Sequence, residues 1–597
     1  MFEQRRAYWR NLDNAAKMFS AASSPKDTRV FRFYCLLKEP VDSGILQEAL
    51  NKTIKKYPVF LSVMRKGLFW HYLEKSELRP TVREEYKEPC SCLYVRDKKA
   101  LLFEVTYYKN RINFEVFHAL TDGTGATEFL RELVKNYLYL AHKEKELPEI
   151  QLSKDKLTVQ DQENDSFSKY YNPDLKRTKK KKVKAYQIKK RGKEYEELKV
   201  VETTLSVKAL LEKARAYGVS MTVLLTAAFI CAIHKEMNKT QEKKPVVLMV
   251  PVNMLNFFSY IEPGYQFGAA EDDFDSVLMA VKQYFEDHLT KEEIAGRMNE
   301  LIAFEKHKIL KWAPLILKDP CIKMGAKMAE GEVTAVLSNM SAVKMPEEYM
   351  PYIERFGVYT STPRMELCVC SFKDTLTCAF TSRYDSLNIQ RNFYEILENI
   401  GVPATVIEPE YPEDAQPNYE GRKFYKGFSF GCMMAAVFAV MANVIFSPQR
   451  LWSVLVAAGI FSMWAALSVG YVKRHNLLKN AMWQLLGVTI GCIIWDACIG
   501  WRGWSVNYVL PIVCLLIQIS MVIVSKIQSH SPREYMIYYV MASMYSILLP
   551  FVLLLTKVIR FRALAVLCVG LSFLFLMALI LFKGKEFKEE MHKKLHV

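Results

Sequence analysis

The chain has 597 residues, of which 51% are hydrophobic and 24% are charged, and its formal net charge is +17. A chain of this length is too long for a single hydrophobic core, so we expect several domains. Its 13 cysteines are scattered without a Cys-x-x-Cys set. This spacing argues against a disulfide-stapled protein or a zinc site and indicates reduced thiols.

The first segment, residues 1–175, mixes strand and helix patterns. It opens without a secretory signal, which predicts that this part of the chain stays in the cytoplasm. Alternating apolar residues predict strands at 30–37 and 112–117. Apolar residues spaced three and four apart predict helices at 44–56 and 125–142.

The stretch from His118 to Gly123 lies between the second of these strands and the helix that follows it. A strand end can hold a histidine rigidly while leaving it reachable, and histidine is a natural proton acceptor near neutral pH. Gly123 has no Cβ, so a ligand can pass close to the backbone there. The residues themselves leave a second interpretation open, in which Asp122 is a helix N-cap and Gly123 a turn residue.

Residues 176–195 form a basic segment, with eleven cations and no acid between residues 176 and 193. Like charges at this density repel one another and favour an exposed linker between two lobes. Two further interpretations are docking on the anionic inner leaflet of a membrane and attraction of the CoA phosphates. Nucleic-acid binding is not expected, because Tyr186 is the one aromatic residue among the cations between residues 176 and 193.

The second lobe is expected at residues 196–420. Ser220 is the predicted N-cap of an apolar helix at 221–233. The expected strands are 246–252, 332–338, 365–371 and 375–382.

Residues 421–597 have a different composition, with six apolar runs of about 20 residues, which is the length that crosses a membrane. Asp496 is the one acidic residue well inside a run, which makes it a candidate functional residue or a snorkelling one, with Arg562 or Lys557 as a possible partner. The runs are 427–446, 452–472, 481–500, 508–525, 535–554 and 564–582.

The cations of this last segment predict its orientation. It holds 18 Lys and Arg against 5 Asp and Glu, which is +13 of the whole charge of +17. Thirteen of these cations flank one side of the six runs and five flank the other. The positive-inside rule then places both termini and the first 420 residues in the cytoplasm, and predicts a multi-pass protein of the cell membrane.

The stretch His118-x-x-x-Asp122-Gly123 resembles the HxxxDG motif of the CoA-dependent acyltransferase superfamily. That superfamily includes chloramphenicol acetyltransferase, condensation domains and bacterial alcohol acetyltransferase-like proteins, and the chain is most similar to the last group. Residues 12–17, 67–70, 218–222, 251–253 and 337–339 also match its motifs, in order.

This resemblance implies a two-lobed α/β domain of the chloramphenicol acetyltransferase type, followed here by an all-α domain of six transmembrane helices. It implies acyl-CoA as co-substrate, no bound cofactor and no metal. His118 would be the general base, Asp122 would orient the structure around it, and Ser338 or Asn339 would bind the oxyanion.

The chain departs from the family where relatives carry an arginine that is thought to hold the motif's aspartate. Here the sequence reads Met254-Leu255 and later Tyr265-Gln266-Phe267. Arg364 or Arg383 is the expected replacement.

Two functions follow from these expectations. The first is a membrane-bound acyltransferase that moves an acyl group from acyl-CoA to a hydroxyl or amine of a lipid-like or amphiphilic acceptor. A six-helix segment favours such an acceptor, because a soluble one needs no anchor of this size. The second is a catalytically decayed domain with a binding or transport role coupled to the membrane helices.

Overall fold

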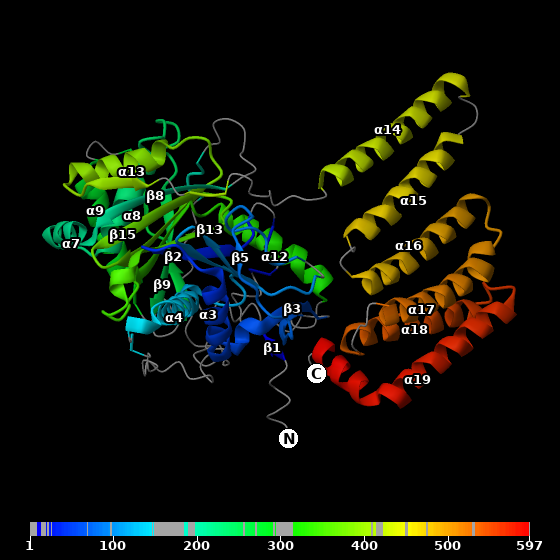
Figure 1. Cartoon of the computed structure of the whole chain (residues 1–597). Coiled ribbons are helices and arrows are strands. Elements are labelled where there is room, and N and C mark those ends of the chain that lie inside the picture. The colour runs from blue at the N-terminus through cyan, green and yellow to red at the C-terminus, as the bar shows by residue number, and fades with distance from the viewer. Residues whose placement is uncertain are drawn as a thin grey trace. The chain divides into compact units, whose positions relative to one another are not determined.

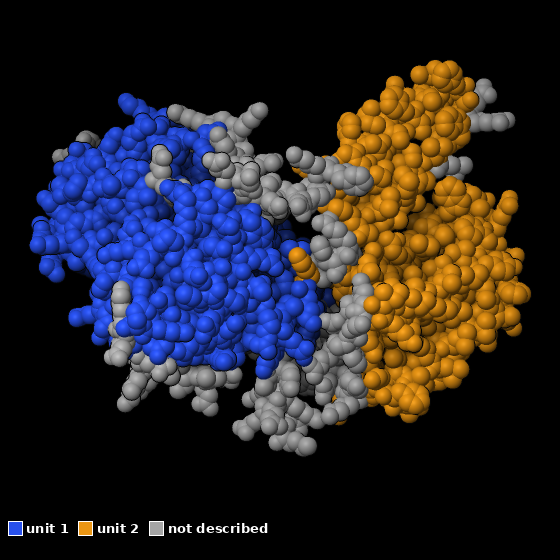
Figure 2. Space-filling model, viewed as in Figure 1, with its two compact units in different colours: residues 1–95, 99–418 blue, residues 96–98, 419–597 orange. Residues whose placement is uncertain are grey.

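The computed structural model divides into two compact units, residues 1–95 with 99–418 and residues 96–98 with 419–597 (Figure 2). It describes residues 9–12, 19–20, 23–24, 27–67, 70–95, 98–145, 147–148, 184–188, 198–254, 257–268, 272–290, 293, 296, 314–407, 410–412, 422–447, 452–472, 476–527 and 532–595. The α/β fold of two lobes followed by six long apolar helices confirms the predicted fold class.

The first lobe is built on a five-stranded sheet with the strand order β13-β2-β7-β6-β5 (Figure 1). All neighbours are antiparallel except β5 and β6. One face of the sheet packs against α3 and α4 in a common apolar core. The bounds are β2 Val30–Leu37, β5 Arg83–Glu84, β6 Phe103–Tyr108, β7 Arg111–Phe117, β13 Ile353–Thr360, α3 Ser43–Lys56 and α4 Gly123–Ala141.

The edge strand β13 comes from the second half of the sequence, more than 300 residues after its partner β2. The two lobes are therefore interlocked, and neither sheet is made of one continuous stretch of chain. A smaller sheet with the order β1-β4-β3 belongs to the first lobe. Its strands are Trp9–Asn11, His71–Lys75 and Ser62–Lys66, and the short helices of this lobe are Pro58–Leu61 and Lys143–Lys145.

The second lobe has an eight-stranded sheet with the order β10-β9-β12-β14-β15-β8-β16, and β11 also pairs with β9. β12 is parallel to both of its neighbours, and the other pairs are antiparallel. The strands are β8 Lys199–Ser206, β9 Val246–Met254, β10 Phe257–Ile261, β11 Gly264–Tyr265, β12 Ala335–Ala342, β14 Glu366–Phe372, β15 Thr375–Ser382 and β16 Ala404–Ile407.

Helix α8 (Met221–His234) lies at the centre of this lobe, and Ser220 caps it as predicted by accepting a hydrogen bond from the Val223 N–H. Buried residues occupy every face of α8, which explains why its sequence lacks a polar stripe. The other helices are α7 Val207–Ala216, α9 Phe274–His288, α12 Leu315–Glu330, α13 Asn388–Asn399 and the short Met350–Tyr352.

The second unit contains six helices that are long and apolar enough to cross a membrane. They agree with the six predicted runs to within a few residues. A π-helical turn, Ser505–Val509, precedes α17, and α19 is kinked at Lys583. The helices are α14 Arg422–Phe446, α15 Trp452–Val472, α16 Leu477–Cys498, α17 Leu510–Ile527, α18 Pro532–Leu555 and α19 Arg562–Leu595.

The face of the first sheet that α3 and α4 leave uncovered is charged, yet it is buried between the lobes. Arg32 on β2 is 2% exposed and donates to Glu85 at 2.5 Å and to Glu115 at 2.7 Å. The neighbouring Tyr34 donates its hydroxyl proton to Glu202 on β8 of the second lobe, at 2.8 Å. A hydrogen-bonded network of buried charges therefore joins the two lobes on the face of the sheet that lies opposite α3 and α4.

We expect Arg32→Met to lower the free energy of unfolding by about 3–5 kcal/mol, because it leaves Glu115 buried without a cation and leaves Glu85 with Arg111 alone. The melting temperature of the full chain in detergent measures this loss. Lys235→Met is the matched control, since it breaks an ion pair with Glu395 in which both side chains are about half exposed. Equal melting temperatures for the two variants would show that water reaches the Arg32 network.

Candidate functional site

His118 is the first residue after β7, and its backbone N–H donates to the carbonyl of Arg29 at 2.8 Å. Arg29 precedes β2 and has the left-handed backbone angle φ 55°, which bends the chain toward the end of β7. The histidine is therefore positioned by two adjacent strands of the first sheet.

Two aromatic rings hold the imidazole of His118. Phe19 stacks on it with 4.1 Å between ring centroids, and Phe31 meets it edge-on at 4.9 Å. The side chain keeps some exposure to solvent, yet protein surrounds most of it. This burial lowers the pKa of His118 to about 4; a bond to its own backbone and the charge of Asp122 oppose the shift, and Arg29 adds to it. The ring is neutral at physiological pH, which is the form that accepts a proton.

Asp122 is the N-cap of α4, and its carboxylate accepts a hydrogen bond from the Gly125 N–H at 2.9 Å. No cation among the described residues forms an ion pair with Asp122. Neither of the two expected arginines forms an ion pair with Asp122. Arg364 instead donates to Gln187 at 2.8 Å and to the carbonyl of Val333. The structure thus gives Asp122 the helix-capping role, and it influences His118 through its charge.

Gly123 allows a close approach between the two lobes. A Cβ at this position would lie 2.7 Å from the Sδ atom of Met340 on β12. A side chain of the second lobe therefore occupies the space that the sequence suggested for a ligand. This contact brings the start of α4 next to the strand that carries Ser338 and Asn339.

Asn339 connects β12 to the first turn of α8. Its side-chain amide donates to the Thr222 hydroxyl at 2.9 Å, and its side-chain oxygen accepts from the Ser341 N–H at 2.9 Å. A β-bulge follows directly, with Ser341 at φ 62°, as is common beside functional sites. Ser338 is buried at 4% exposure. The fold therefore brings three of the motifs together, those at residues 118–123, 218–222 and 337–339.

The sequence did not indicate that charged residues from both lobes surround Arg29. Asp27 pairs with Arg29 at 2.9 Å in the first lobe. Glu366, at the start of β14, comes from the second lobe. Burial and the charge of Asp27 raise the pKa of Glu366 to about 8, although Arg29 opposes this shift. Residues so far apart in the chain carry no common motif that a sequence pattern could reveal.

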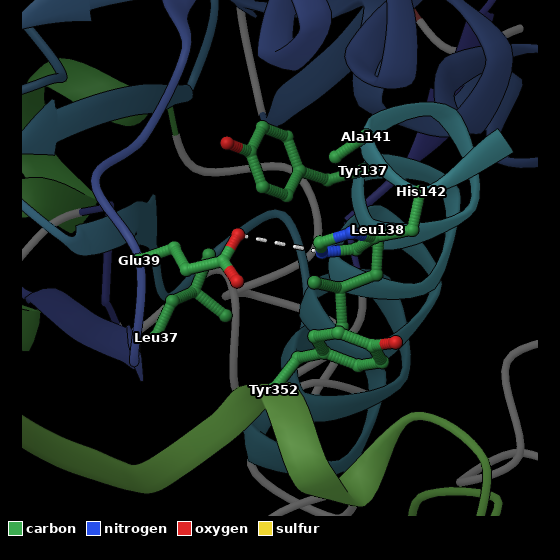
Figure 3. Close-up of a pocket in the computed structure, with 7 residues that line it drawn as sticks. All are labelled: Leu37, Glu39, Tyr137, Leu138, Ala141, His142 and Tyr352. Carbon is green, nitrogen blue, oxygen red and sulfur yellow. Dashed lines mark ion pairs between the residues drawn. The ribbon is translucent and has the colours of Figure 1, made fainter. Parts of the chain in front are cut away.

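A second histidine lines a small pocket at the other end of α4 (Figure 3). His142 caps the C-terminus of this 19-residue helix, stacks on Tyr352 at 4.1 Å and lies 3.7 Å from Glu39. The helix length places this pocket roughly 28 Å from the N-terminus of α4, beside which His118 lies. It is separate from the site around His118.

Asp496 is fully buried in the second unit, at the end of α16. Its carboxylate accepts hydrogen bonds from the N–H groups of Arg502, Gly503 and Ser505 and from the Ser505 hydroxyl, at 2.7–3.1 Å. Neither Arg562 nor Lys557 pairs with it. The geometry assigns Asp496 to the organisation of the loop that leads into α17.

Most of the basic segment at residues 176–195 lies outside the described residues, so its three interpretations remain predictions. Within the described part, 184–188, the backbone of Tyr186 donates to the Pro245 carbonyl at 2.8 Å, so this piece runs beside the second lobe. The described residues contain no group of three or more His, Cys, Asp or Glu side chains that could hold a metal ion.

Residues 411–597 match the model of a family of unknown function (DUF6320). No curated protein matches the chain. Solved structures with a similar shape include a trichothecene 15-O-acetyltransferase from Fusarium sporotrichioides, at 11% identity, 66% of this chain, 94% of that chain and a TM-score of 0.44. They also include the starter condensation domain of rhizomide synthetase, at 11% identity, 66% of this chain, 96% of that chain and a TM-score of 0.42. A third is a wax ester synthase/diacylglycerol acyltransferase from Marinobacter aquaeolei VT8, at 16% identity, 66% of this chain, 100% of that chain and a TM-score of 0.38.

The capping role of Asp122 predicts a specific pair of results. Asp122→Asn should leave stability nearly unchanged, because asparagine caps a helix about as well as aspartate. Asp122→Ala should cost about 1 kcal/mol, because it removes the acceptor of the Gly125 N–H. Thermal melting of both variants measures this difference. A loss in Asp122→Asn as large as in Asp122→Ala would instead indicate an ion pair with a residue outside the described part of the chain.

Proposed function

We propose that the chain is a membrane-bound acyltransferase that moves an acyl group from acyl-CoA to a hydroxyl or amine of a lipid-like acceptor. The observation that carries this proposal is the neutral, partly exposed imidazole of His118, held between two rings at a strand end where three motif segments meet. The neutral imidazole is the form that accepts a proton, and its fixed position where the three motif segments meet supports the role of a general base.

In the proposed reaction, His118 accepts the proton of the acceptor hydroxyl while the oxygen attacks the thioester carbonyl. The tetrahedral intermediate then collapses, the carbon–sulfur bond breaks, and the imidazolium returns its proton to the CoA thiolate. The low pKa of His118 makes the imidazolium a ready proton donor for this second step. No covalent acyl-enzyme is required, and the alignment of both substrates supplies much of the remaining acceleration.

Two residues of β12 are the candidates for the oxyanion site. Asn339 uses its amide group and its oxygen to bridge α8 and the bulge, so it positions this part of β12. Ser338, which is buried next to it, is the side chain we propose as the hydrogen-bond donor to the developing oxyanion.

The proposed membrane location is supported by the composition of the six helices. They expose large apolar side chains that water would not favour, including Phe438, Phe461, Leu516, Phe573 and Leu581, each more than 50% exposed. We propose that these surfaces contact lipid, that both termini lie in the cytoplasm, and that the acceptor is a membrane amphiphile.

One observation favours the second function, a decayed domain with a binding role. Asp122 has no ion-pair partner among the described residues, whereas relatives of the resembled superfamily are thought to hold this aspartate with an arginine. Enzyme assays on variants of His118 distinguish the two functions.

His118→Ala and His118→Gln should lower acyl transfer about 10²–10⁴-fold while changing the melting temperature little. The assay incubates membranes that contain the full chain with labelled acetyl-CoA or long-chain acyl-CoA and follows label into extracted lipid. Membranes without the protein give the background. Wild-type transfer that does not exceed this background would favour the decayed domain, and full activity in His118→Ala would exclude the proposed base.

The pKa of His118 predicts the acid limb of the pH–rate profile. Because the neutral ring is the active form and its pKa is about 4, kcat/KM should fall only as the pH drops toward 4, and not near the ordinary value of about 6.5. Phe19→Ala should move this limb upward, because removal of the stacked ring lets water stabilise the imidazolium. A wild-type limb near 6.5 that Phe19→Ala leaves in place would contradict the burial argument.

A further inference from the structure

Two loops lie at the same end of the helices in the second unit, residues 499–504 between α16 and α17 and residues 556–561 between α18 and α19. These loops and the first residue of α19 carry four exposed cations, Arg502, Lys557, Arg560 and Arg562, which together we call the cation platform.

Hydrogen bonds hold the two loops together. The side-chain oxygen of Asn507 accepts from the N–H groups of Arg560 and Phe561, at 2.8 and 2.9 Å, and its amide donates to the carbonyl of Gly503. Asp496 fixes the first loop through the four hydrogen bonds described above. The cations therefore extend from backbone that is already ordered, so less entropy is lost when an anion binds.

The positive charge of the platform has no counter-charge within the described part of the second unit. None of the four cations forms an ion pair with a described residue. Asp496 is the nearest acid in the sequence, and its carboxylate is fully engaged inside the loop. Between residues 497 and 585 the sequence contains one acid, Glu534. It lies at the opposite end of α18 from Lys557.

Aromatic side chains surround the platform. Trp501, Tyr508 and Phe561 are each about half exposed, and the rings of Tyr508 and Phe561 lie 5.7 Å apart. Exposed aromatic rings at the ends of apolar helices are typical of the level of lipid head groups. The predicted orientation also puts four of the five outer cations in this one place. The positive-inside rule does not explain why four cations gather here, because it concentrates cations on the opposite, cytoplasmic side.

We propose that the cation platform binds the phosphate of an anionic phospholipid head group. Guanidinium groups match phosphate oxygens in a two-pronged geometry, and the rings beside them contact the first carbons of the lipid. This inference rests on the proposed membrane location of the six helices and is independent of acyl transfer by His118.

The test measures lipid binding to the full chain in detergent by native mass spectrometry. Dioleoyl-phosphatidylglycerol should bind the wild type in preference to dioleoyl-phosphatidylcholine, and added salt should weaken that preference. Arg502→Gln with Arg560→Gln should weaken phosphatidylglycerol binding by about tenfold or more. Arg502→Lys with Arg560→Lys, which keeps the charge, should retain most of it.

The matched control is Lys526→Gln with Lys588→Gln, which removes two exposed cations at the other end of the helices. This control should bind phosphatidylglycerol as the wild type does. Equal binding of the two lipids by the wild type, or an equal loss in both glutamine variants, would overturn the proposal. Displacement of the lipid by glycerol phosphate at constant ionic strength would also overturn it, because the ligand would then be a soluble phosphate.

Discussion

The burial of Arg32 between two carboxylates is the constraint on which the first unit depends. It requires the second lobe to cover the polar face of the first sheet, while α3 and α4 cover the apolar face. Tyr34 and Glu202 extend the same network across the lobes. Glu115 of this network lies on the central strand β7, three residues before His118, so the buried charges and the histidine share one strand.

The periodicity of the sequence predicted those parts of the fold that depend on local chemistry. β2 begins at Val30 and ends at Leu37 as the alternation predicts, Ser220 caps α8, and six helices occupy the six apolar runs. What it could not predict was the pairing of β13 with β2, because a strand pattern specifies neither its partner nor its sheet. Nor did it indicate that the polar face of β2 is buried, since Arg32 alternates with apolar residues as an exposed side chain would.

The site shows the same division between local and long-range information. Asp122 as an N-cap is a local property, and the sequence offered it beside the ion pair. The ring of Phe19 against His118, the ion pair of Arg29 and the contact of Gly123 with Met340 arise only in the fold. Burial, to which the Phe19 ring contributes, and the charge of Arg29 lower the pKa of the histidine, and the motif alone does not specify either of them. The hydrogen bonds of Asp496 to the turn at residues 502–505 are likewise visible only in the fold, and a functional role for this acid stays a prediction.

The placement of β13 has a consequence for biosynthesis. Until residue 360 has been made, β2 has an open edge, and the first sheet lacks one of its strands although its other strands were made some 250 residues earlier. An unpaired edge strand of this kind is a site for incorrect pairing with other chains. The first lobe must therefore wait for most of the second lobe before it is complete, and the first apolar helix, at residue 422, follows only about 60 residues later. The last strand of the first sheet and the first of the six apolar helices thus leave the ribosome close together during translation.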